Sequence, residues 1–103
     1  MGGASGGPSV NVGLLIAQIH LPGVASLKEK RQVLRRLKDR LREHYNVSVA
    51  EVEHQDLWQR AALGVVGIAS ARLPLEQTFA RIRDEFERQT PGEILSCDVE
   101  YLS

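Results

Sequence analysis

Cysteine is almost absent from this sequence, since Cys97 is the one thiol among 103 residues. A single thiol cannot form a disulfide within the chain, and such sparse cysteine is typical of proteins in a reducing compartment. The sequence therefore argues against a small disulfide-stapled scaffold and predicts a cytoplasmic protein.

Long apolar runs and targeting signals are also missing. No run approaches the roughly 20 residues that a membrane-spanning helix needs. The opening MGGASGGPSV lacks the charged and apolar regions of a secretory signal, and Gly6 stands where a myristoylation signal has Ser or Thr. We therefore expect no membrane association. The composition predicts a flexible Gly/Ser-rich tail at 1–9 and one domain at 10–103.

Residue patterns typical of catalysis or cofactor binding are scarce. His54 and Asp56 are two potential metal ligands two residues apart, which is a weak signal, and no glycine-rich loop leads directly into a helix. Cys97 belongs to an expected strand and has no histidine placed beside it by the sequence. We therefore predict no cofactor, no metal and no small-molecule substrate, and a protein that is not an enzyme.

Net charge is zero, but the charge is unevenly distributed. Residues 26–45 hold eight Lys and Arg against three acids, so this segment carries +5 and the rest of the chain −5. A protein that binds polyanions over its whole surface is usually basic overall. Attraction to an anion would therefore come from one local surface.

Hydrophobic periodicity predicts four strands and two helices. The strands are expected at 11–21, 46–53, 61–70 and 93–102, where β-branched and aliphatic residues concentrate. Ser26 and Glu29 form a capping-box pattern at the start of the first helix, whose apolar face has a gap at Lys30. Pro74 is expected in the first turn of the second helix.

The order strand–helix–strand–strand–helix–strand predicts an α+β, ferredoxin-like fold. Right-handed crossovers place both helices on one face of a four-stranded antiparallel sheet. The most apolar strands, at 11–21 and 61–70, should be central. Leu14, Ile16, Val66 and Ile68 should then share one face. If this is the open face, it needs a partner, which would be a second copy in a homodimer or another protein.

Five cations form a stripe on the first helix. At 100° per residue, they fall within about 40–120° of Leu34, beside the apolar face and with no acid among them; they are Lys28, Arg31, Arg35, Lys38 and Arg42. On the opposite flank, Arg36–Asp39 and Arg40–Glu43 pairs are expected to balance charge. The stripe is either a solvated helix face or a surface that contacts RNA phosphates.

The connection 54–60 is the second candidate for an interface. It contains Gln55, Asp56, Trp58 and Arg60, and Trp and Arg are typical interface anchors. The alternative is that Trp58 folds back and covers the end of the sheet. No aromatic residue lies on either central strand, so base stacking on the sheet is not expected.

Three stretches together resemble a known family, the YlxP-like proteins, which are small bacterial proteins classed as a domain of unknown function (number 503). They are VGLLIAQIHLPGVA (12–25), SLKEKRQVLRRL (26–37) and NVSVAEVEHQDLWQRAALGV (46–65). The resemblance covers about residues 11–102 and implies a ferredoxin-like fold and a translation-linked role in the cytoplasm. It assigns no function to any of its motif residues. The Gly-rich tail departs from the family pattern.

Three hypotheses remain from the sequence. The first is a binding protein that docks on ribosomal RNA or a ribosomal particle through the basic stripe. The second is a protein–protein adaptor or homodimer that uses the open sheet face and the Trp58 connection without contacting RNA. The third is a small-ligand regulator, which this topology also supports.

Overall fold

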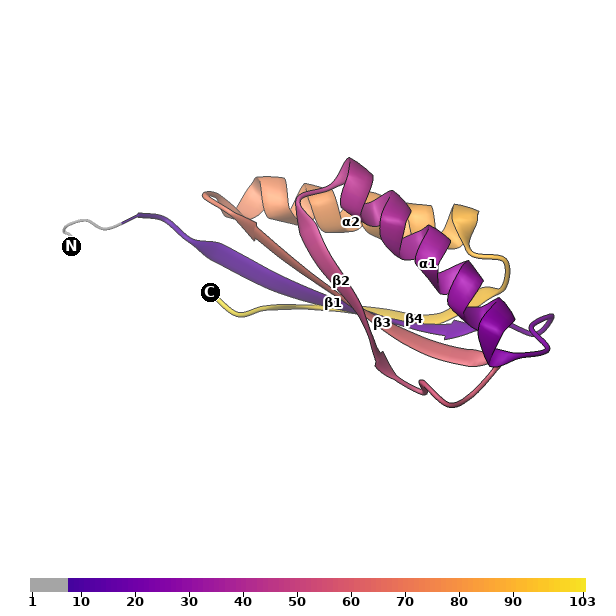
Figure 1. The fold of residues 1–103 in the computed structure, drawn as a ribbon. Helices are drawn as coiled ribbons and strands as arrows, with labels where there is room; N and C mark the ends of the chain where they lie inside the picture. The colour runs from indigo at the N-terminus through magenta and orange to yellow at the C-terminus, as the bar shows by residue number, and fades with distance from the viewer. Residues whose placement is uncertain (1–7) are drawn as a thin grey trace.

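Six elements follow one another in the order β-α-β-β-α-β in the computed structural model, which describes residues 8–103 (Figure 1). This order confirms the predicted ferredoxin-like α+β fold. Residues 1–7 of the predicted tail lie outside the described residues. The elements are β1 (Asn11–His20), α1 (Leu27–His44), β2 (Val47–Glu53), β3 (Arg60–Ala69), α2 (Arg72–Gln89) and β4 (Glu93–Tyr101).

The sheet has the order β2-β3-β1-β4, and all neighbouring strands are antiparallel. The two apolar strands β1 and β3 are therefore central, as predicted. In their register, Leu14 lies opposite Val66 and Ile16 opposite Gly64. Because side chains alternate between faces, these positions lie on the face away from the core.

Ser26 caps α1 much as the sequence predicts. Its Oγ accepts a hydrogen bond from the Glu29 amide at 3.1 Å. The Glu29 carboxylate accepts from the Ala25 amide at 3.3 Å, one residue before the amide that the capping-box pattern predicts. The cap fixes where α1 begins, and therefore which of its residues face the sheet.

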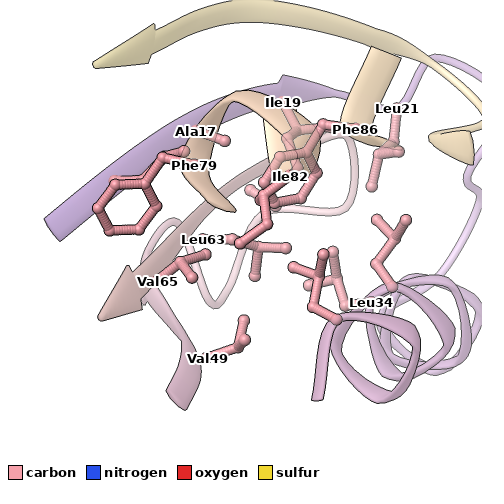
Figure 2. Packing of buried hydrophobic residues seen from close by; sticks show 14 of the residues in the cluster. Ala17, Ile19, Leu21, Leu34, Val49, Leu63, Val65, Phe79, Ile82 and Phe86 are labelled. Atoms are coloured by element: carbon pink, nitrogen blue, oxygen red, sulfur yellow. The ribbon is translucent and has the colours of Figure 1, made fainter. Parts of the chain in front are cut away.

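Both helices pack on one face of the sheet, and the core lies between them and the strands (Figures 1 and 2). Leu15, Ala17 and Ile19 of β1 point into this core and are fully buried. Figure 2 shows Phe79, Ile82 and Phe86 of α2 and Leu34 of α1 directed toward the same space. Within residues 8–103, no helix covers the opposite face of the sheet (Figure 1).

Candidate nucleic-acid interface

The basic stripe of α1, defined as Lys28, Arg31, Arg35, Lys38 and Arg42, runs along the flank of the helix beside β2. Its position is fixed by Arg42, whose Nη2 donates to the Val49 carbonyl of β2 at 2.7 Å. Three of the cations share a surface hollow of about 320 Å³, lined by Arg31, Leu34, Arg35, Lys38 and Glu51. Four of the five predicted stripe residues, all but Lys28, therefore lie beside β2.

Lys30 belongs to the interior rather than to the stripe. Its side chain is 1% exposed, and its Nζ lies 2.7 Å from Glu51 Oε2 and donates to the His54 carbonyl at 2.6 Å. The gap that the sequence shows in the apolar face of α1 is thus filled by a buried lysine. Its charge is paired, as buried charges must be. Glu51 also lines the hollow beside the stripe, and its negative charge is paired with Lys30.

Arg42, predicted to contact RNA, and Gln55, predicted to contact a protein partner, both bond to the free edge of the sheet. β2 is an edge strand, so backbone groups that point away from β3 have no partner in the sheet. Arg42 donates to the Val49 carbonyl, and Gln55 Nε2 donates to the Glu51 carbonyl at 3.4 Å. Arg42 also lies 3.8 Å from the Asp39 carboxylate. Part of the bonding capacity of Arg42 is therefore used within the fold.

The other four cations of the stripe are free to meet a ligand. Within residues 8–103, no carboxylate lies within 4.0 Å of the charged groups of Lys28, Arg31, Arg35 or Lys38. Lys28, Arg31 and Arg35 are exposed, and Lys38 is partly covered. These four residues are called the four free cations below.

The opposite flank of α1 differs from the prediction. Among the described residues, neither Arg36 and Asp39 nor Arg40 and Glu43 form the expected ion pairs. Asp39 lies 3.8 Å from Arg42 instead. The arginines instead line a groove of about 270 Å³ between α1 and the end of α2, together with Val33, Leu37, Gln89 and Pro91. Helical spacing alone did not determine which arginine, if any, each acid pairs with.

The connection between β2 and β3 is braced against the N-terminal end of α1. His54 takes a left-handed conformation with φ 64°, and its carbonyl accepts from both Lys30 Nζ and the Leu57 amide. Gln59 Nε2 lies 3.2 Å from the carbonyls of Pro22 and Val24, just before α1. Apart from the polar side chains themselves, no pattern in the sequence predicted that Lys30 and Gln59 would hold this connection.

Trp58 stands out from this braced connection with 52% of its surface exposed. This exposure argues against the alternative in which Trp58 folds back and covers the end of the sheet. It shares a shallow hollow with Asp56, Leu57, Gln59 and Arg60. Arg60 begins β3 and approaches Gln18 Oε1 at 3.4 Å, on the open face of the sheet. Of the four predicted partner residues, Gln55, Asp56 and Trp58 are exposed on the connection, and Arg60 is partly buried.

A small titratable cluster lies where α1 meets α2. Glu85 is 8% exposed, its Oε2 has no hydrogen-bond partner, and His44 Nδ1 lies 3.8 Å from Oε1. Burial raises the pKa of Tyr45, and the hydrogen bond and negative charge of Glu85 raise it further. Arg81 and Arg88 oppose this effect. The Tyr45 phenol is therefore held neutral beyond its ordinary range.

We expect Tyr45 to ionise above pH 10, and Glu85→Gln to lower that pKa because it removes the negative charge. Since the folded pKa exceeds the unfolded one, this stabilisation is complete below about pH 10 and declines as pH rises through the folded pKa. Phenolate absorbance during a pH titration, in a Tyr101→Phe background, measures the midpoint. A midpoint unmoved by Glu85→Gln would contradict this assignment.

Two structural absences hold for residues 8–103. No group of three or more His, Cys, Asp or Glu side chains in this range is placed to hold a metal ion. Neither of the two helices is long and apolar enough to cross a membrane. His54 and Asp56, weighed above as metal ligands, therefore gain no third ligand among the described residues.

Comparisons with known proteins agree with this fold. The chain is similar in structure to the de novo designed protein Foldit4, with a TM-score of 0.58 and 14% identity over 91% of this chain and 97% of that one. It is also similar to the structural-genomics protein YJCS, with a TM-score of 0.54 and 8% identity over 89% of this chain and 99% of that one. At these identities, both likenesses show the fold alone. A 57-residue segment is 42% identical to the "Uncharacterized protein YlxP" of Bacillus subtilis (strain 168), covering 55% of this chain and 62% of that protein, less than two thirds of its length. Residues 12–99 match the family described as "Protein of unknown function (DUF503)", and the chain belongs to that family.

Proposed function

We propose that this protein binds RNA through the basic stripe of α1 and docks on a ribosomal particle in the cytoplasm, as a binding protein rather than an enzyme. The observation that carries the proposal is the set of four free cations along one flank of α1. From Lys28 to Lys38 they span about 15 Å at 1.5 Å per residue. Such a row follows a phosphate backbone without reading its sequence.

The exposed Trp58 supports a single-stranded rather than a duplex target. Its connection is attached to the same end of α1 at which the stripe begins, through Lys30 and Gln59. An unpaired base can stack on an exposed indole beside a basic surface, whereas bases in a helix are already stacked. Asp56 beside Trp58 limits how closely a phosphate approaches the ring.

The expected affinity is modest and depends on salt. Four phosphate contacts to single-stranded RNA give a slope of log K against log salt of about −0.7 × 4, which is about −2.8. Between 50 and 200 mM salt, binding should weaken by about 50-fold. Adding Arg42 as a fifth contact would steepen the slope to about −3.5, at the loss of its bond to Val49.

The decisive experiment compares two variants of identical composition. Arg31→Glu with Arg35→Glu reverses the charge at two positions of the stripe. Arg36→Glu with Arg40→Glu makes the same change on the opposite flank of the same helix. We expect the wild type and the second variant to sediment with Bacillus subtilis ribosomal particles at low salt. The stripe variant should stay at the top of the gradient, with binding reduced at least tenfold.

Both variants should first show the circular dichroism spectrum of the wild type, so that lost binding can be attributed to the changed surface and not to unfolding. Equal loss of binding in the two variants would mean that general charge, and not the stripe, drives association. Binding that both variants retain would show that the stripe is not needed. A wild type that stays at the top at 50 mM salt would overturn the proposal.

A further inference from the structure

The open face of the sheet carries an apolar patch that no part of residues 8–103 covers. On β3 and β2 its exposed side chains are Ile68 at 55%, Val52 at 44% and Val66 at 43%. Leu14 and Ile16 of β1 complete it, opposite Val66 and Gly64. Contiguous apolar surface of this kind on a sheet typically marks an interaction site.

The patch contains both a hollow and a projection. The hollow holds about 170 Å³ and is lined by Leu14, Ser48, Val49, Ala50, Val52, Gly64 and Val66. It exists because Gly64 has no side chain, and Val52 and Ile16 already lie 3.1 and 3.5 Å from where a Cβ would stand. Ile68 projects from the same strand four residues further on. A surface that holds both features can fit against its own copy, as a two-fold interface requires.

We propose that the occupant of this face is a second copy of the chain, packed sheet to sheet. Four strands about 4.8 Å apart and about nine residues long form a face of about 19 by 30 Å. Two such faces cover on the order of 1,100 Å² in projection, just above the roughly 1,000 Å² that a biological interface should bury. The face is therefore large enough for a dimer.

Charged residues on the edge strand β4 determine which arrangement of the two copies is favoured. Asp98 and Glu100 of β4 lie on the open face, opposite Ile16 and Leu14. A two-fold axis across the strands stacks β4 on β4 and brings these carboxylates together. An axis along the strands lays β4 over β2 of the other copy, where Ser48 and Ala50 are uncharged and Arg42 holds the edge. Like-charge repulsion therefore favours β4 over β2.

The same acids exclude the alternative use of this face for RNA. Carboxylates along the β4 side repel phosphates, and the patch has no aromatic side chain on which a base could stack. At the other end of the face, Gln18 donates to Glu53 and accepts from Arg60. His20 lies 3.1 Å from the Glu93 carboxylate there. This polar border is typical of the rim of a protein–protein interface.

Sedimentation equilibrium tests the dimer. The wild type should show about twice the 11.4 kDa of one chain at tens of micromolar, including in 1 M salt. Ile68→Asp or Val66→Lys should leave monomers, because a charge then enters the apolar interface. Leu73→Asp on α2, at a side chain that is 62% exposed, is the matched control and should remain dimeric.

The arrangement has its own test at Ser48. Ser48→Lys should strengthen association, because the lysine meets Asp98 and Glu100 of the other copy, and Ser48→Glu should weaken it. The reverse order would overturn the β4-over-β2 arrangement. A wild type that stays monomeric at several hundred micromolar, or a dimer that survives both Ile68→Asp and Val66→Lys, would overturn the proposal itself.

Discussion

Lys30→Met is expected to lower the free energy of unfolding by about 3 kcal/mol. The lysine is 1% exposed and its ammonium lies between the Glu51 carboxylate and the His54 carbonyl. Removing it leaves a carboxylate that is only 18% exposed without its counter-charge. That residual exposure places the loss near the lower end of the range for broken buried pairs.

A double-mutant cycle separates the pair from its surroundings. Lys30→Met with Glu51→Met removes both charges, so its cost should fall below the sum of the single changes by at least about 1 kcal/mol. Urea unfolding followed by circular dichroism measures all four proteins. Lys28→Met, the same substitution at an exposed position of the same helix, should stay within about 0.5 kcal/mol of wild type. Additive single effects would show that the two charges act independently.

The same change should loosen the Trp58 connection, because Lys30 binds the carbonyl of its first residue. Trp58 is the only tryptophan of the chain, so its fluorescence anisotropy reports directly on this connection. The motif residues Lys30 and Glu51 thus serve the candidate interface indirectly, by holding the connection in place against α1.

Phe79→Ala is the second change with a large expected effect, a loss of about 3–5 kcal/mol. Phe79 is 2% exposed, and its ring lies 6.1 Å from that of Tyr101, centroid to centroid. The ring packs directly on the backbone of β1, because a Cβ at Gly13 would stand 2.5 Å from Phe79 Cε2. Truncation therefore opens a cavity between α2 and the centre of the sheet.

Gly13→Ala provides the matched test of this contact. Alone, it forces the Phe79 ring to move and should cost about 1–3 kcal/mol. Combined with Phe79→Ala, the new methyl group partly fills the vacated space, so the double variant should lose less than the sum of the two. Urea unfolding of the three variants measures this, and strict additivity would mean that the ring relaxes away from Gly13 without cost.

Much of the fold could be predicted from the sequence because local rules and the hydrophobic pattern agree. The capping residue Ser26, the apolar spacing of both helices and the small apolar residues of β3 each indicated one element type. As predicted, Pro74 lies in the first turn of α2, which begins at Arg72. Proline is tolerated throughout the first turn, so it marks the start of a helix only to within a few residues.

The candidate site was predicted less completely, because side-chain partners are chosen in three dimensions. The helical spacing placed the stripe on one flank of α1. Spacing could not show that Arg42 would bond to Val49, or that Asp39 would turn from Arg36 to Arg42. The sequence does contain one indication that Lys30 is buried. At 100° per residue, Lys30 falls about 20° from the centre of the apolar face of α1.

By itself, the sequence determined the element order, the central position of β1 and β3 and the separation of charge on α1, because these follow from the periodicity of side chains along each element. Only the tertiary structure decided which charges are free. The packing of α1 on β2 matched Lys30 with Glu51 and drew Arg42 to the sheet edge. Burial of a charge requires a partner from elsewhere in the chain, and that partner is fixed only when the elements pack.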